Sequence, residues 1–131
     1  MYPAIRPQYH FRQTGSGLDA WDVRRLIQLA EHLPVRQIDP SSLPDIHTNP
    51  WYKEDGAVPS PLSFVEHMRL TAECDLTYPI ILDARGRVMD GMHRVCKALL
   101  NNVSSIPAVQ FASDPVPDFV NCHPKDLPYD T

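Results

Sequence analysis

Apolar residues recur at helical spacing in three stretches of the chain, near residues 19–33, 60–74 and 92–100. Asp19 or Asp22 can cap the first helix, and Ser60-Pro61 begins the second. The residues expected to face the interior are Trp21, Leu26, Leu29, Ala30 and Leu33 in the first helix, Leu62, Val65, Met68, Leu70 and Ala72 in the second, and Val95, Ala98 and Leu99 in the third. Pro34 ends the first helix, and Asn101-Asn102 closes the third with a left-handed cap.

Short apolar runs bounded by turn residues predict strands at 35–43, 79–82, 87–89 and 106–111. A tight turn at residues 83–86 would join the second run to the third, with Gly86 available for a positive φ. Strands mixed with helices in this order predict a mixed α+β (α/β) fold, in which a small sheet is flanked by about three helices.

Three segments lack a clear period. Residues 1–17 are predicted to form an extended N-terminal arm, 44–60 a long loop, and 113–131 a proline-rich tail lying over the surface. Residues 18–112 then form a single domain, because 131 residues suit one core better than two. Fourteen prolines against five glycines fit stiff connections and short elements.

The net charge and the cysteine content narrow the range of functions that the sequence suggests. A net charge of −4 predicts no overall attraction to nucleic acid or an anionic membrane, although a local basic cluster can still bind phosphate. Three widely spaced cysteines without a Cys-x-x-Cys pair favour neither a disulfide framework nor a zinc cluster. No apolar run has the length of a signal peptide core or a membrane span, so a soluble cytoplasmic protein is expected.

Asp90-Gly91-Met92-His93-Arg94 stands where a predicted strand meets a predicted helix. The first amides of a helix lack internal partners and carry positive potential, and Gly91 lets an anion approach the backbone. Two cations in the first turn oppose the helix dipole by roughly 0.3–1 kcal/mol each. A bound phosphate would offset this cost. The structural alternative stays open, with Asp90 as a cap, His93 as a packed ring and Arg94 in solvent.

Other candidates for chemistry are weaker. Glu54 and Asp55 in the long loop could supply a base or bind Mg²⁺, although loop carboxylates are usually only solvated. Arg85 and Arg87 at the hairpin are minor candidates for phosphate contacts. His67 is expected to be a surface or packing residue, and Trp21 and Trp51 are expected to anchor the arm and the loop.

Several runs together resemble the ParB/sulfiredoxin superfamily. These are Tyr78 to Leu82, Gly86 to Arg94, Lys97-Ala98-Leu99 and Ile106 to Val109, with residues 35–43 and Asn49-Pro50 similar to the superfamily's opening strand and loop. Members include sulfiredoxins, free serine kinases that use ATP or ADP, and the CTP-hydrolysing domain of ParB. The Asp-Gly-x-His-Arg form is most similar to the serine-kinase-like members.

The resemblance implies a nucleotide, ATP or another, bound with its phosphates at the start of the third helix. Gly91, Met92, His93 and Arg94 would cradle the phosphates, and Asp90 would orient a substrate hydroxyl, a metal or the motif loop. Two departures from the superfamily matter. Met92 replaces the catalytic cysteine of sulfiredoxins, so sulfinic-acid repair is not expected. ParB carries Glu-Arg-Arg after the glycine and further domains for which this chain leaves no room, so DNA clamping is not expected either.

Three functional hypotheses remain. The first is an enzyme that transfers a phosphoryl group to a hydroxyl-bearing metabolite, or hydrolyses a nucleotide, with Mg²⁺ and with Asp90, His93 or Glu54 as catalytic groups. The second is a module that binds a nucleotide without turnover. The third, a ParB-like nuclease, is disfavoured by the acidic net charge and the lack of a carboxylate cluster. The sequence leaves the base, the acceptor and the oligomeric state open.

Overall fold

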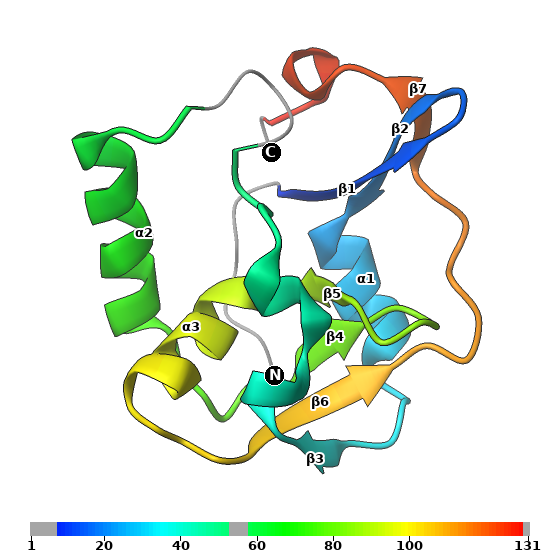
Figure 1. The fold of residues 1–131 in the computed structure, drawn as a ribbon. Coiled ribbons are helices and arrows are strands. Elements are labelled where there is room, and N and C mark those ends of the chain that lie inside the picture. The colour runs from blue at the N-terminus through cyan, green and yellow to red at the C-terminus, as the bar shows by residue number, and fades with distance from the viewer. Residues whose placement is uncertain (1–7, 53–57, 130–131) are drawn as a thin grey trace.

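The computed structural model describes residues 8–52 and 58–129, which form two β-sheets and three α-helices (Figure 1). The predicted mixed α+β class is confirmed. In chain order the elements are β1 (Tyr9–Thr14), β2 (Gly17–Asp22), α1 (Val23–Ala30), β3 (Arg36–Ile38), the 3-10 helices η1 (Pro40–Ser42) and η2 (Pro44–His47), α2 (Pro61–Glu73), β4 (Ile80–Leu82), β5 (Val88–Asp90), α3 (Met92–Leu100), β6 (Ile106–Gln110), β7 (Phe119–Cys122) and η3 (Pro124–Asp126).

The larger sheet has the strand order β3-β6-β4-β5, in which β4 and β6 are parallel and the other neighbours are antiparallel. Alternate side chains of β4 point to opposite faces. Ile81 packs in a cluster with Leu26 of α1, whereas Ile80 and Leu82 pack with Val95 of α3. The sheet therefore lies between α1 and α3, and it fixes the point at which β5 ends and α3 begins.

The smaller sheet corrects the interpretation of both chain ends. Residues 9–14, expected to be part of an extended arm, form β1 and pair with β2. Residues 119–122, expected to be part of a surface tail, form β7, which pairs with the other edge of β2. The pairing of β7 with β2 joins segments about a hundred residues apart, and such a contact leaves no periodic trace in the local sequence.

The predicted helix boundaries are confirmed where a cap sets them. Asp22 caps α1 by accepting a hydrogen bond from the amide of Arg24 at 2.9 Å, and Ser60 caps α2 by accepting one from Ser63 at 3.1 Å. After α3, Asn102 adopts the left-handed conformation with φ 54°. In the described segments no helix has the length and apolarity needed to cross a membrane.

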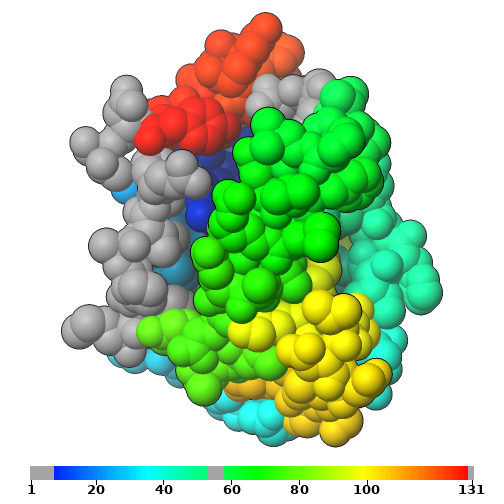
Figure 2. Space-filling view, turned by 90° about the vertical axis from the view of Figure 1, so that its left-hand side faces the viewer, coloured from blue at the N-terminus to red at the C-terminus, as the bar shows by residue number. Residues whose placement is uncertain are grey.

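Part of the predicted interior is wrong. Leu29 is 42% exposed, whereas Trp21 is buried as expected but belongs to β2 rather than to the first helix. The larger error concerns α2, whose expected inward residues Leu62 and Met68 are 69% and 67% exposed. Figure 2 shows this helix, in green, forming the outer surface of one side of the molecule. The period of the pattern was correct, but the apolar side of α2 points away from the protein.

Candidate functional site

The predicted motif lies where β5 meets α3. Asp90 is the last residue of β5, and Gly91 is the N-cap of α3 with φ 111°. A Cβ atom at Gly91 would lie 2.6 Å from Cγ2 of Ile80 and 2.8 Å from Nη2 of Arg94. Both the backbone conformation and the surrounding atoms therefore require glycine at this position.

Arg94 folds back over this glycine. Its Nη2 donates a hydrogen bond to Oδ2 of Asp90 at 3.1 Å, and the two side chains are 13% and 19% exposed. The Nε of Arg94 is buried and has no hydrogen-bond partner among the described residues. Arg94 and Asp90 thus form a partly buried ion pair at the start of α3. The guanidinium of Arg94 balances the negative charge of the Asp90 carboxylate.

Gly91, the N-cap of α3, has no side chain with which to cap the helix. The first backbone hydrogen bond of the helix runs from the amide of Val95 to the carbonyl of Gly91 at 3.1 Å. The amides before Val95 precede the first possible intrahelical bond and point out of the helix end, where the dipole adds positive potential. This terminus and the Arg94 guanidinium are the positive groups of the site.

His93 contacts α2 and the long loop. Its Nε2 lies 2.8 Å from Nδ1 of His67, and the ring of Trp51 stacks on both imidazoles at centroid distances of 3.9 Å to His67 and 4.9 Å to His93. Burial lowers the pKa of His93 to about 4, with the neighbouring His67 and Arg94 adding to the shift. Burial also lowers the pKa of His67. Both rings are neutral at pH 7, and one donates the shared hydrogen bond to the other.

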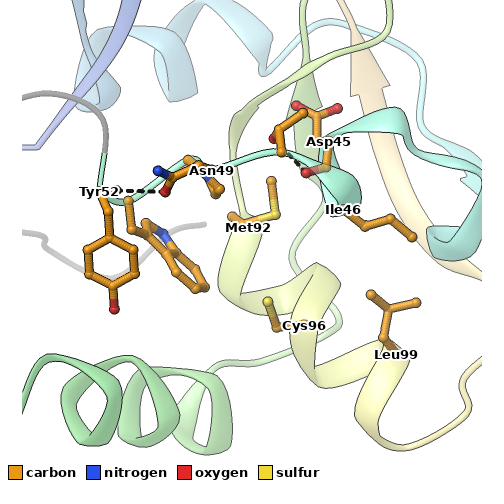
Figure 3. A pocket seen from close by; sticks show the side chains of 10 residues that line it. Asp45, Ile46, Asn49, Tyr52, Met92, Cys96 and Leu99 are labelled. Atoms are coloured by element: carbon orange, nitrogen blue, oxygen red, sulfur yellow. Dashed lines mark hydrogen bonds between the residues drawn. The ribbon is translucent and has the colours of Figure 1, made fainter. Parts of the chain in front are cut away.

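A pocket of about 240 Å³ lies beside the first turns of α3 (Figure 3). Its walls come from the segment around η2 and the loop that follows, and from one side of α3. The lining residues are Asp45, Ile46, Thr48, Asn49, Pro50, Trp51, Tyr52, Met92, Cys96 and Leu99. Most of these side chains are apolar or aromatic, so the pocket suits the less polar part of a ligand whose charged part binds at the helix terminus.

The structure assigns a place to some of the other predicted site residues, and others lie outside the described residues. Met92 lines the pocket, and Arg87 donates to the buried carboxylate of Asp83 at 3.2 Å, which is a structural role. Glu54, with Asp55, lies outside the described residues. Burial raises the pKa of the Cys96 thiol, so this cysteine is not a thiolate nucleophile at neutral pH.

Sequence reasoning missed two features of this region. His67 and Trp51, expected to pack or to anchor a loop, do so in one cluster with His93, in which the ring of Trp51 stacks on both imidazoles. The carboxylate of Asp45 accepts the amide of Val88 at 3.1 Å through Oδ2, while its buried Oδ1 has no partner within the described segments. Nothing in the local pattern marks either contact, because each one joins separate elements.

Within the described part of the chain, no group of three or more His, Cys, Asp or Glu residues is placed to hold a metal ion. No protein-family model matches the sequence, and neither a curated protein nor a solved structure matches it significantly. The resemblance to the ParB/sulfiredoxin superfamily therefore stays a prediction from the motif residues.

Proposed function

We propose that this protein binds a nucleotide, with the phosphate groups at the N-terminus of α3. The observation that carries the proposal is the position of Arg94, a first-turn cation folded over a glycine that admits no side chain. A cation in a first turn opposes the helix dipole, and a bound anion would add to the compensation that Asp90 gives. The uncapped end of α3 supplies backbone donors at the same place.

The adjoining pocket supports a nucleotide rather than a bare phosphate. Trp51, Met92 and Leu99 give it apolar and aromatic walls, while Asn49 at its edge carries an amide. A flat heterocycle buries well against such side chains, and a few polar groups fix its orientation. The pocket and the terminus share Met92, the first residue of α3, so one ligand can occupy both.

The geometry supports binding more directly than catalysis. Asp90, one of the predicted catalytic groups, is paired with Arg94, and the Nε2 of His93 contacts His67. Phosphoryl transfer to a hydroxyl-bearing metabolite would require Asp90 to exchange Arg94 for the acceptor or for Mg²⁺. Mg²⁺ is commonly held by one or two carboxylates together with substrate phosphates, so Asp90 is the residue that would hold it here. Phosphoryl transfer therefore requires a rearrangement of Asp90 that nucleotide binding alone does not.

Calorimetric titration with ATP, ADP, CTP and inorganic phosphate, with and without Mg²⁺, tests the proposal. We expect saturable nucleotide binding that Arg94→Ala weakens roughly 10- to 100-fold, the effect of losing hydrogen bonds to a charged group. Arg85→Ala is the matched control, because Arg85 is an exposed arginine that donates a hydrogen bond from its backbone amide to Asp83.

The variant Asp90→Asn separates binding from metal-assisted chemistry. Without Mg²⁺ it is expected to bind nucleotide more tightly than the wild type, because it removes a carboxylate near the phosphates while keeping Arg94. With Mg²⁺ held by Asp90, the same change would weaken binding. Product formation in the presence of a hydroxyl-bearing acceptor would establish transfer. Absence of binding by all four ligands, or equal loss in Arg85→Ala, would refute the proposal.

A further inference from the structure

Helix α2 attaches to the rest of the protein through a polar stripe. Ser63, His67 and Thr71 recur every four residues and are the inward positions of the helix. Ser63 donates from Oγ to the hydroxyl of Tyr52 at 2.9 Å, and His67 pairs with His93 at 2.8 Å. Thr71 is the one buried residue of α2, and its hydroxyl donates to the carbonyl of His67. The inner side of α2 is thus mainly polar, with Phe64 at its edge in contact with the ring of Tyr52.

The exposed side of α2 carries several large hydrophobic side chains beside the charged Glu66 and Arg69. Its large hydrophobic side chains are between 47% and 69% exposed; they are Leu62, Phe64, Val65, Met68 and Leu70. A surface helix normally turns its apolar stripe toward the core and its polar side to water. Here the large apolar side chains are exposed instead, and Figure 2 shows the helix on the surface of the molecule. Several large apolar side chains exposed on one helix mark an interaction surface.

We propose that α2 is the interface between two copies of this chain, packed antiparallel about a twofold axis near the middle of the helix. Leu62, Val65, Met68 and Ala72 recur at intervals of three and four residues and are all exposed. This spacing forms the seam of a packed helix pair. In a twofold interface the same patch serves both partners, so the patch must be complementary to itself.

The charges beside the seam meet that requirement. Glu66 and Arg69 are exposed and lie on either side of the middle of α2, one residue before His67 and two residues after it. Antiparallel pairing brings Glu66 of one copy beside Arg69 of the other, and the twofold axis repeats the contact. Within the described segments neither side chain forms a salt bridge. A pattern that is its own complement when reversed fits a second copy better than an unrelated protein.

The size of the helix sets the expected strength. Thirteen residues span about 20 Å, and one face of such a helix buries less than the roughly 800 Å² per partner of a standard interface. The dimer should therefore form with increasing protein concentration rather than be permanent. Its seam does not include the N-terminus of α3, so self-association is independent of the nucleotide proposal.

Analytical ultracentrifugation of the full chain over a range of concentrations, up to those used for NMR, tests the interface. We expect a monomer–dimer equilibrium that Val65→Glu shifts to monomer. Leu100→Glu is the matched control, because Leu100 is an equally apolar side chain, 75% exposed at the end of α3 and outside the seam. Far-UV circular dichroism checks that both variants stay folded.

Charge exchange provides a second test that does not depend on the apolar variant. Glu66→Arg and Arg69→Glu should each weaken dimerisation roughly 3- to 10-fold by replacing attraction with repulsion. The double variant restores complementarity and should recover most of the affinity. A monomer at every concentration, a dimer unaffected by Val65→Glu, or a double variant no better than the single ones would overturn the proposal.

Discussion

Gly91 connects the end of the sheet to the start of α3, and it does so under two independent constraints. Its φ of 111° lies in a region that side chains disfavour, and the space for a Cβ is already filled by Ile80 and Arg94. The close approach of Arg94 depends on this empty position. At the residue scale, the glycine is what allows the ion pair and the helix terminus to share one small volume.

Replacing Gly91 with alanine should therefore destabilise the protein by about 2–5 kcal/mol, since backbone strain and overpacking add. Gly86→Ala should cost only about 1–2 kcal/mol, because Gly86 has φ 82° but its Cβ would meet nothing closer than 3.8 Å. Gly15→Ala, with no atom within 4 Å, should change stability by less than about 0.5 kcal/mol. Urea unfolding of the three variants measures whether their losses of stability follow this order. Equal losses at Gly91 and Gly86 would contradict the role of the surrounding atoms.

At the scale of elements, the cluster of Trp51, His67 and His93 joins the long loop, α2 and α3. Its stacked rings and its histidine–histidine hydrogen bond require at least one neutral imidazole. The charged side chains that act on the pair are Arg94, which disfavours protonation of His93, and Glu66, which favours protonation of His67. Acid should therefore loosen the attachment of α2.

The direction of the pH effect follows from the lowered pKa of His93. Above pH 6.5 the ring is neutral in both the folded and the unfolded chain, so it adds no pH dependence. Between about pH 6.5 and about pH 4 the unfolded chain gains a proton that the folded protein excludes, and the free energy of unfolding falls as the pH falls.

Urea unfolding at a series of pH values, with wild type and His93→Gln side by side, measures this contribution. His10, whose pKa burial also lowers to about 4, titrates in the same range but is common to both proteins. The wild type should lose more stability than His93→Gln across this interval. Parallel curves would show that His93 is not buried in its neutral form.

At the scale of the whole molecule, one arginine joins the two sheets. Arg12 of β1 contacts Asp83 and Asp114 at 2.8 Å each, and its guanidinium lies 4.8 Å from the ring centre of Trp21. Asp83 follows β4, is only 1% exposed, and also accepts the amides of Arg85 and Arg87. The smaller sheet is thus fixed to the turn between β4 and β5 by a buried carboxylate.

Arg12→Ala should lower the free energy of unfolding by about 3 kcal/mol, because it leaves the buried charge of Asp83 with Arg87 as its remaining cation. Arg24→Ala removes an exposed pair with Asp22 and should lower the free energy of unfolding much less. Thermal or urea unfolding compares the two. Similar losses would mean that Arg12 contributes no more than a surface ion pair.

The sequence by itself determined the features set by neighbours along the chain. Caps at Asp22 and Ser60, the turn glycine Gly86, and the strand–glycine–helix junction at Gly91 all follow from interactions within about four residues. Such contacts are encoded by residue type and spacing, so they are visible before folding. The mixed α+β class and the location of the candidate site came from the same local signals.

Only the tertiary structure decided what joins distant segments. The pairing of β7 with β2, the contact of His67 with His93, and the outward apolar side of α2 each depend on which elements meet. A hydrophobic period gives the width of an apolar stripe on a helix but not the direction in which it points. That direction is set by the long-range contacts that close the chain, and in α2 they are hydrogen bonds from a polar stripe.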